Sequence, residues 1–185
     1  MKPFTVHTLE TAPAKSRASL EALKAGIGMI PNMAATMAES PALLDVFVAM
    51  RNRFGQADFT PLEQEMILLA AAVENGCTYC AAVHSTLALH HGAPKEAVVD
   101  VREGGVPAEP RLKVLASTTR ALTRGRGAIT AADVAQAERA GLTRSMVLDI
   151  CLGIAVGSLV SLIDHLVPET PLDAAFEAQA WSPPD

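Results

Sequence analysis

One cluster of residues in this sequence has the types and spacing that redox chemistry requires. Two residues separate Cys77 from Cys80, and His84 follows four positions after the second cysteine. If residues 77–91 form a helix, Cys80 and His84 are neighbours on one face, whereas Cys77 and His84 are two turns apart. The spacing therefore predicts that His84 is the partner of Cys80 and not of Cys77.

Three properties of this cluster favour the thiolate, which is the form of cysteine that attacks a disulfide or a peroxide. The pair lies in the first turn of the expected helix, where free N–H groups and the helix dipole favour an anion. His84 can accept the thiol proton of Cys80. The spacing of Cys77 and Cys80 also allows the two sulfurs to close a disulfide after oxidation. The pattern indicates a redox pair that turns over.

The segment before the cysteines supplies a carboxylate that could orient the histidine. Residues 61–74 have helical periodicity, and Glu65 lies on their apolar face, where a buried carboxylate needs a partner. We therefore expect Glu65 to pair with His84, directly or through a water. Glu63 fits a capping box at the helix start. Glu74, at the helix end, is expected to be solvated.

Other interpretations of the cysteines are open. A zinc site would have three ligands and no fourth, whereas a structural zinc site normally has four, and we expect no metal or other cofactor. The cysteines could also be small buried hydrophobic residues beside a core histidine. A permanent disulfide between Cys77 and Cys80 would close only a tiny loop and stabilise little. Cys151, within an apolar segment, is expected to be an inert buried thiol.

The composition predicts an all-α fold. Half of the 185 residues are hydrophobic and 4% are aromatic, which suits packed helices, and no segment alternates as a strand would. The length fits a single domain over residues 1–185. We expect a redox core at about 40–105, a second helical half at about 108–167 and a C-terminal tail at 168–185, in which Trp181 packs on its own or a neighbouring subunit.

A short internal similarity relates residues 92–101 to residues 141–150. It suggests two related helical hairpins. At this offset, Cys77 and Cys80 correspond to Arg126 and Ile129, so the redox chemistry would belong to the first copy alone.

Charge and hydropathy limit the partners. The net charge of −5 argues against nucleic acid or an anionic membrane. The longest uncharged apolar run, residues 150–163, is shorter than the roughly 20 residues that span a bilayer. We expect a core or interface helix there, with Gly153 and Gly157 permitting close approach, and Asp164 and His165 as its C-terminal cap. No apolar segment of signal-peptide length begins the chain, which predicts a cytoplasmic protein.

The motif resembles that of a known family. Glu65 twelve positions before Cys77, then Cys80 and His84, is similar to the active-site motif of the alkyl hydroperoxidase D (AhpD)-like proteins, within the carboxymuconolactone decarboxylase family. The core of the resemblance covers roughly residues 40–105. Residues 30–44 and 170–181 also resemble the peroxidase-related subgroup, so that the resemblance spans most of the chain.

The resemblance implies an all-helical homo-oligomer, either a dimer, a trimer or a hexamer, that acts as an antioxidant thiol peroxidase or disulfide reductase without metal or haem. Hydroperoxide would be the substrate, and a dithiol or thioredoxin-like protein the reductant. Carried over from the family, Cys80 is the peroxide-reactive cysteine, and the more exposed Cys77 resolves it. Glu65 and His84 form the proton relay through a water. The best-studied members have a histidine where this chain has Tyr79, and a phenol is a poor base at neutral pH.

Two other functions fit the same residues. The chain could be a non-enzymatic redox sensor, in which the Cys77–Cys80 disulfide changes assembly or partner binding. It could also be an acid/base enzyme of the carboxymuconolactone decarboxylase type that uses Glu65 and His84, with the cysteines incidental.

Overall fold

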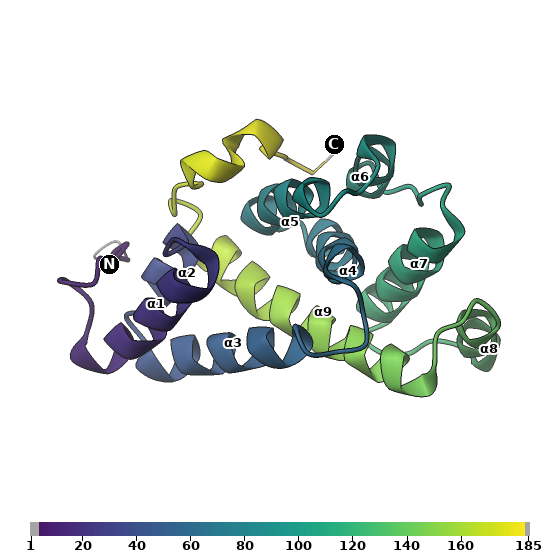
Figure 1. Ribbon diagram of the computed structural model, residues 1–185, viewed down its shortest axis with the longest axis horizontal. Helices are drawn as coiled ribbons and strands as arrows, with labels where there is room; N and C mark the ends of the chain where they lie inside the picture. Colours follow the sequence, from purple (N-terminus) through teal and green to yellow (C-terminus); the bar gives the residue numbers. More distant parts are fainter. Residues whose placement is uncertain (1–3, 184–185) are drawn as a thin grey trace.

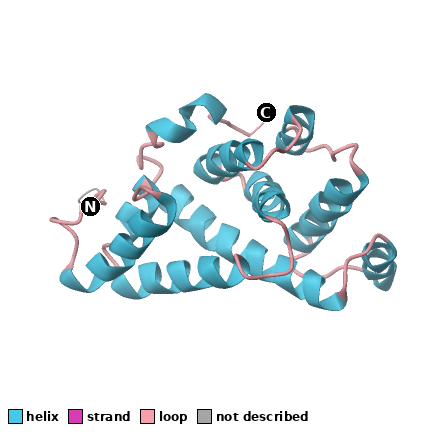
Figure 2. Cartoon of the chain, in the orientation of Figure 1, coloured by secondary structure: helices cyan, strands magenta, loops and turns pink. Residues whose placement is uncertain are grey.

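The computed structural model describes residues 4–183, and every regular element within that range is a helix (Figures 1 and 2). The helices are α1 (Ala14–Ile27), α2 (Asn32–Met37), α3 (Pro41–Phe54), α4 (Pro61–Glu74), α5 (Thr78–His90), α6 (Lys95–Arg102), α7 (Pro110–Arg124), α8 (Ala131–Arg139), α9 (Arg144–Leu166) and the 3-10 helix η1 (Ala174–Gln179). The predicted all-α class is confirmed. The ends of the predicted 1–185 domain, residues 1–3 and 184–185, lie outside the described part.

Helix α4 is the centre of the fold, and its start is encoded locally. The Thr60 side chain accepts a hydrogen bond from the Glu63 N–H, and the Glu63 carboxylate accepts one from the Thr60 N–H, with Pro61 at the first helical position. This is the predicted capping box. Residues 63–72 are all buried, because α4 packs against α5, α6, α7 and α9 (Figure 1). The most central helix therefore carries Glu65 into the core.

Helix α9 is the long apolar helix that the sequence predicts, and its glycines lie inside this chain's own core. A Cβ added at Gly153 would lie 2.8 Å from the ring of Phe54 on α3 and 3.1 Å from Ile67 on α4. A Cβ at Gly157 would lie 3.5 Å from Ala71. Among the described helices, only α9 is long and apolar enough to cross a membrane. Helices buried in a protein core meet the same criteria.

The repeated segments share a local conformation. Gly92 and Gly141 both have a φ of 87°, in the left-handed region that favours glycine. Three residues later, α6 begins at Lys95 and α9 at Arg144. The sequence similarity thus reflects the same turn and helix start, although α6 has 8 residues and α9 has 23.

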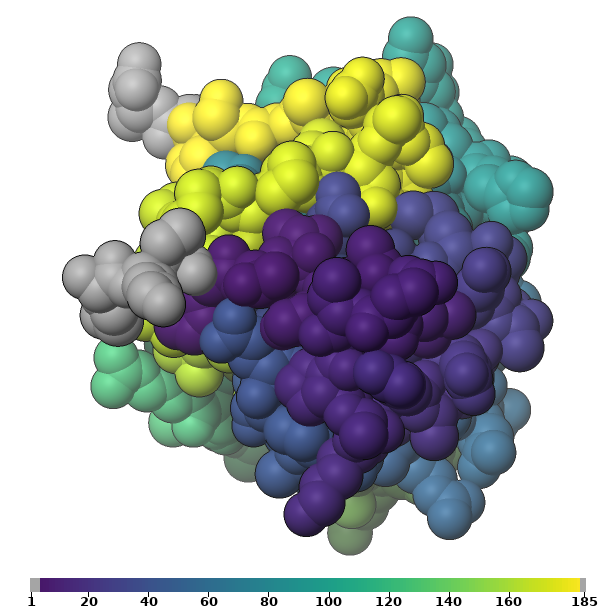
Figure 3. Space-filling view, turned by 90° about the vertical axis from the view of Figure 1, so that its left-hand side faces the viewer, coloured from purple at the N-terminus to yellow at the C-terminus, as the bar shows by residue number. Residues whose placement is uncertain are grey.

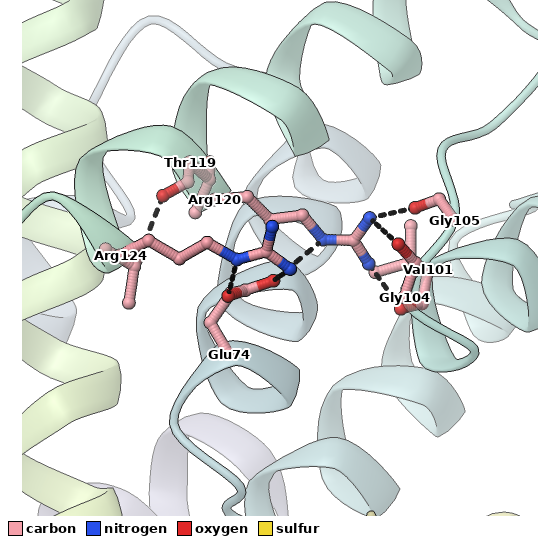
Figure 4. Close-up of polar contacts among 8 residues, drawn as sticks. Glu74, Val101, Gly104, Gly105, Thr119, Arg120 and Arg124 are labelled. Atoms are coloured by element: carbon pink, nitrogen blue, oxygen red, sulfur yellow. Dashed lines mark hydrogen bonds and ion pairs between the residues drawn. The ribbon is translucent and has the colours of Figure 1, made fainter. Parts of the chain in front are cut away.

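The side chain of Glu74 is largely covered, which makes the prediction that it is solvated wrong. Its side chain is 8% exposed and pairs with Arg124, whose Nη2 lies 2.9 Å from Oε1, and with Arg120, whose Nε lies 3.3 Å from the same oxygen (Figure 4). Arg120 also donates to backbone carbonyls within residues 101–105. Helix α7 packs along the end of α4 and covers this carboxylate, which an end position in the sequence does not reveal.

The C-terminal segment folds back over α5. The η1 helix packs on α5, and Arg102 of α6 donates to the side chain of Gln179 and to the carbonyl of Ala180, both at 2.9 Å. Trp181 packs against the core of its own chain, which is one of the two arrangements that we expected. In Figure 3 this segment (yellow) lies beside the N-terminal part of the chain (purple).

Candidate functional site

Glu65 and His84 form the predicted pair. His84 Nδ1 lies 2.7 Å from Glu65 Oε2, and this joins α5 to α4. The other carboxylate oxygen accepts a hydrogen bond of 2.8 Å from Nη2 of Arg51, which lies in the last turn of α3. Sequence reasoning missed Arg51, because only the packing of α3 beside α4 brings it to the glutamate. The Glu65 side chain is 3% exposed.

The electrostatics of this triplet favour an ionised glutamate. Burial by itself would raise the pKa of Glu65, but the hydrogen bond with His84 and the positive charges of His84 and Arg51 outweigh it and hold the pKa below its ordinary value. An ionised Glu65 can only accept hydrogen bonds, so His84 Nδ1 carries the proton. Among the described residues, His84 Nε2 has no hydrogen-bond partner, which leaves it free to exchange a proton.

The two cysteines meet at the N-terminus of α5. Cys77 is the N-cap residue, one position before the helix start at Thr78, and its Sγ accepts a hydrogen bond from the N–H of Cys80 at 3.2 Å. Cys77 is 0% exposed and Cys80 is 2% exposed. The expectation that Cys77 is the more exposed cysteine does not hold in the single chain, in which both cysteines are buried.

Cys80 is a protonated thiol in this environment, contrary to the expectation that its thiolate is favoured. The hydrogen bond with Cys77, burial, and the negative charges of Cys77 and Asp164 together raise its pKa well above the ordinary value. No hydrogen bond joins Cys80 to His84 within residues 4–183. Sharing a helix face brings two residues near one another but does not fix the direction of their side chains, and His84 turns toward Glu65.

Asp164 is a site residue that sequence reasoning assigned differently. It was expected to cap its own helix, α9, but its Oδ2 accepts from the N–H of Thr78 at 3.0 Å and from the Thr78 hydroxyl at 3.4 Å. It is buried, and it therefore caps the N-terminus of α5 beside the cysteines. His165, next to it, has Nε2 3.3 Å from the carbonyl of Gly76. Nothing in the sequence pairs residues 86 positions apart.

Tyr79, between the cysteines, faces the C-terminal segment. Its hydroxyl donates a short hydrogen bond to Asp173 and accepts one of 3.3 Å from the N–H of Met33. Burial and then the Asp173 hydrogen bond raise the pKa of the phenol above its ordinary value of 10.0. Tyr79 is thus a neutral donor, as its chemistry suggested, and Asp173 is a partner that the sequence did not identify.

Cys151 is exposed, so the expectation of a buried thiol is wrong. It lies at a pocket of about 420 Å³ together with Asn75, Arg126 and Ile154. The helix that carries it, α9, is apolar on all sides, and hydropathy alone does not distinguish its core face from its outer face. Within residues 4–183, no three His, Cys, Asp or Glu side chains are arranged to hold a metal ion.

Comparisons with known proteins agree with this architecture. Residues 41–110 match the model of the carboxymuconolactone decarboxylase family. Among curated proteins, no match was found. An AhpD-core, peroxidase-related protein from Ralstonia eutropha JMP134 superposes with a TM-score of 0.81 at 21% identity, over 95% of this chain and 96% of that chain.

Two further solved structures have the same fold. A peroxidase-related protein from Silicibacter sp. TM1040 has a TM-score of 0.74 at 22% identity, over 97% of this chain and 98% of its own. The debrominase Bmp8, solved in complex with 2,3,4-tribromopyrrole, has a TM-score of 0.79 at 15% identity, over 97% of this chain and 96% of that chain. Residues 41–110 thus match the carboxymuconolactone decarboxylase family, and the chain as a whole has the AhpD-like fold.

Proposed function

We propose that this protein is a thiol-dependent oxidoreductase that reduces hydroperoxides through Cys77 and Cys80, with Glu65 and His84 as a proton relay. The observation that carries this proposal is the hydrogen bond from the backbone N–H of Cys80 to the Cys77 sulfur, which holds the Cys77 side chain beside Cys80 at a helix N-terminus. A pair in this position can cycle between dithiol and disulfide. The proposal includes a homo-oligomeric, cytoplasmic enzyme that needs no cofactor.

The reaction divides into three balanced steps. A cysteine thiolate attacks the terminal oxygen of the hydroperoxide, the O–O bond breaks, and the alkoxide leaves as an alcohol after taking a proton. The second thiol then attacks the resulting sulfenic acid, which releases water and forms the disulfide. An external dithiol, or a thioredoxin-like protein, reduces this disulfide. In the family's order, Cys80 reacts first and Cys77 resolves.

The Glu65–His84 pair fits the proton transfer to the alkoxide. His84 Nε2 can deliver a proton through a water, and the ionised Glu65 stabilises the imidazolium from which that proton comes. Arg51 keeps Glu65 ionised and oriented. This arrangement needs no base between the cysteines, so Tyr79 in place of a histidine leaves the proposed relay intact.

The test is hydroperoxide-dependent oxidation of dithiothreitol by the purified protein. We expect turnover that falls to background in Cys77→Ser and in Cys80→Ser, and that is retained in Cys151→Ser, the matched control on another helix. Glu65→Gln should lower the rate by about a hundredfold, within the range for loss of general acid–base assistance. Undiminished turnover in Cys80→Ser would overturn the proposal.

The same variants separate the two other functions. Disulfide formation that changes assembly, with no catalytic turnover, would indicate a redox sensor. An activity that survives loss of both cysteines but not of Glu65 would indicate an acid/base enzyme. The debrominase with the same fold was solved in complex with 2,3,4-tribromopyrrole, so brominated pyrroles are a further class of compound to assay with these variants.

A further inference from the structure

The cysteine pair is enclosed in the single chain, although its proposed chemistry needs contact with other molecules. Cys77 is 0% exposed and Cys80 is 2% exposed. A pocket of about 330 Å³ lies beside residues 6–10 and the pocket of about 420 Å³ lies at Cys151, and neither is lined by a cysteine of the pair. A buried sulfur reacts with a peroxide or another thiol only when that molecule can reach it. Part of the fold must therefore move away before the pair can react.

The segment after α9 lies against the start of α5. We call residues 168–183 the C-terminal strap; they include η1 and are drawn in yellow in Figure 1. A Cβ added at Gly76, directly before the first cysteine, would lie 4.0 Å from Cγ of Pro183. The hydroxyl of Tyr79, between the two cysteines, donates to Asp173. The strap is thus a direct neighbour of the turn in which α5 begins.

The strap is the least buried of the elements around the start of α5. Within residues 168–183, only Asp173 and Phe176 are buried, and the 3-10 helix has no side-chain cap. By contrast, α2 is buried over residues 33–37, α4 over residues 63–72, and α9 along its core side. Segments with few buried contacts open at a lower free energy than the molecule as a whole. We therefore expect the strap to open while these helices stay folded.

Hydrogen bonds fasten the strap near each of its ends. The first fastening, between Asp173 and Tyr79, lies beside the cysteines. The second lies on α6, where Arg102 donates to the side chain of Gln179 and to the carbonyl of Ala180, both at 2.9 Å. Among the described residues, the Arg102 guanidinium makes no hydrogen bond outside the strap. A change at Arg102 therefore loosens the strap and leaves the proposed redox residues untouched.

We propose that the C-terminal strap is the gate of the cysteine pair. In the closed position it covers the thiols, and its release from α5 and α6 admits the hydroperoxide and, once the disulfide has formed, the external dithiol. Opening makes and breaks no covalent bond, so the three reaction steps proposed above are unchanged. The inference rests on the proposed function for the nature of the two reactants, whereas the covering of the thiols does not depend on it.

The test is the rate at which iodoacetamide alkylates each cysteine of the folded protein, read by peptide mass spectrometry. Each rate is divided by the rate of the same cysteine in the urea-unfolded chain, which removes differences in intrinsic reactivity. Cys151, which is exposed, is the reference within the same molecule. We expect the pair to be strongly protected relative to Cys151, because only molecules with an open strap are modified. Equal protection of all three cysteines would overturn the proposal.

Arg102→Ala removes both hydrogen bonds to the end of the strap. Labelling of the pair should become about fivefold faster, the factor that corresponds to the loss of one net hydrogen bond, and Cys151 should keep its rate. Arg144→Ala is the matched control, because it removes a surface arginine whose partner, Glu138 at 2.9 Å, lies outside the strap. It should leave every rate unchanged. An unchanged rate for the pair in Arg102→Ala would overturn the gate.

A second measurement uses the unaltered protein and separates strap opening from global unfolding. Release of the strap exposes little surface, so the labelling rate of the pair should hardly rise at low concentrations of urea. Global unfolding exposes the whole core, and its equilibrium constant changes steeply with urea. A labelling rate that rises with urea as steeply as global unfolding does would overturn the proposal.

Turnover of a hydroperoxide with dithiothreitol connects the gate to the reaction. Arg102→Ala should raise kcat/KM for the hydroperoxide by about the same fivefold factor, because access to the pair precedes the chemistry. Faster labelling without faster turnover would overturn the gating of the reaction. The labelling experiments need no peroxide. A protein with the expected labelling but no peroxidase turnover would therefore retain the strap as the cover of the pair and lose only the proposed function.

Discussion

Glu65 is a buried carboxylate with a partner for each oxygen. His84 and Arg51 come from two different helices, and each lies within 2.8 Å of one Glu65 oxygen. An unpaired ionised carboxylate in this position would be strongly destabilising, so the two partners make the charge tolerable. At this scale, the charge that serves the proposed relay is also a source of stability that depends on pH.

We expect the free energy of unfolding to fall as the pH drops below about 4.5, the ordinary value for glutamate. The folded state holds the pKa of Glu65 below that value, so the unfolded state binds more protons in this range. The stabilisation is complete above the unfolded pKa and is lost as the pH falls through the folded pKa. Urea unfolding at several pH values should show a smaller acid-dependent loss in Glu65→Gln, and identical losses would contradict this.

At the scale of elements, the C-terminal segment is tied to α5 by Tyr79. The phenol bridges Asp173 and the N–H of Met33, and Asp173 also accepts from the N–H of Asn32. One side chain thus connects α5, the start of α2 and the segment before η1. Tyr79, directly before Cys80, thus makes contacts that hold three segments of the fold together.

Tyr79→Phe should destabilise the protein by about 1–3 kcal/mol, because it leaves the buried N–H of Met33 and one Asp173 oxygen without this partner. The change should be read from urea unfolding. Hydrogen exchange should increase in the segment around η1, and Thr86→Val, elsewhere on α5, serves as a control whose exchange in that segment should stay unchanged. If the segment around η1 keeps its full protection from hydrogen exchange in Tyr79→Phe, then Tyr79 does not hold that segment on α5.

Two glycines on α9 allow a matched comparison of helix packing. Gly153→Ala would bring a Cβ within 2.8 Å of the Phe54 ring, which is closer than carbon atoms approach, and should cost about 1–3 kcal/mol. Gly157→Ala meets Ala71 at 3.5 Å, an ordinary contact, and should be neutral or stabilising by up to about 1 kcal/mol through helix propensity. Thermal unfolding measures both. Equal effects would mean that α9 packs differently on α3.

At the scale of the whole molecule, α9 presents an apolar outer face. Leu148, Leu162 and Leu166 are 70%, 67% and 59% exposed. With Leu152, Ala155 and Leu159 they form a stripe with alternating spacings of four and three residues, the pattern by which helices pack side by side. This stripe supports the proposed homo-oligomer, in which a second copy covers it.

Leu162→Glu should therefore reduce the oligomer to smaller species, because a charge on this stripe would be buried in the interface. Size-exclusion chromatography with light scattering measures the mass. Val99→Glu, an exposed apolar position on α6, is the control and should keep the original mass. A Leu162→Glu variant of unchanged mass would place the interface elsewhere or exclude one.

The parts of the site that follow local rules were predictable. The capping box at Thr60, the stop before Cys77 and the shared face of Cys80 and His84 depend on residues within one or two helical turns. Glu65 could be matched to His84 because a carboxylate on an apolar face needs a partner. Such inferences use hydrogen bonds and periodicities whose range along the chain is short.

The sequence alone determined that the chain is all-helical, that Glu65 pairs with His84, and that Cys77 and Cys80 lie together at a helix start. Only the tertiary structure decided that Asp164 caps the cysteine helix, where its negative charge contributes to the raised pKa of Cys80. The physical reason is that a protonation state depends on every charge and donor nearby. Most of those at the cysteines come from helices that are distant in sequence and become neighbours only on folding.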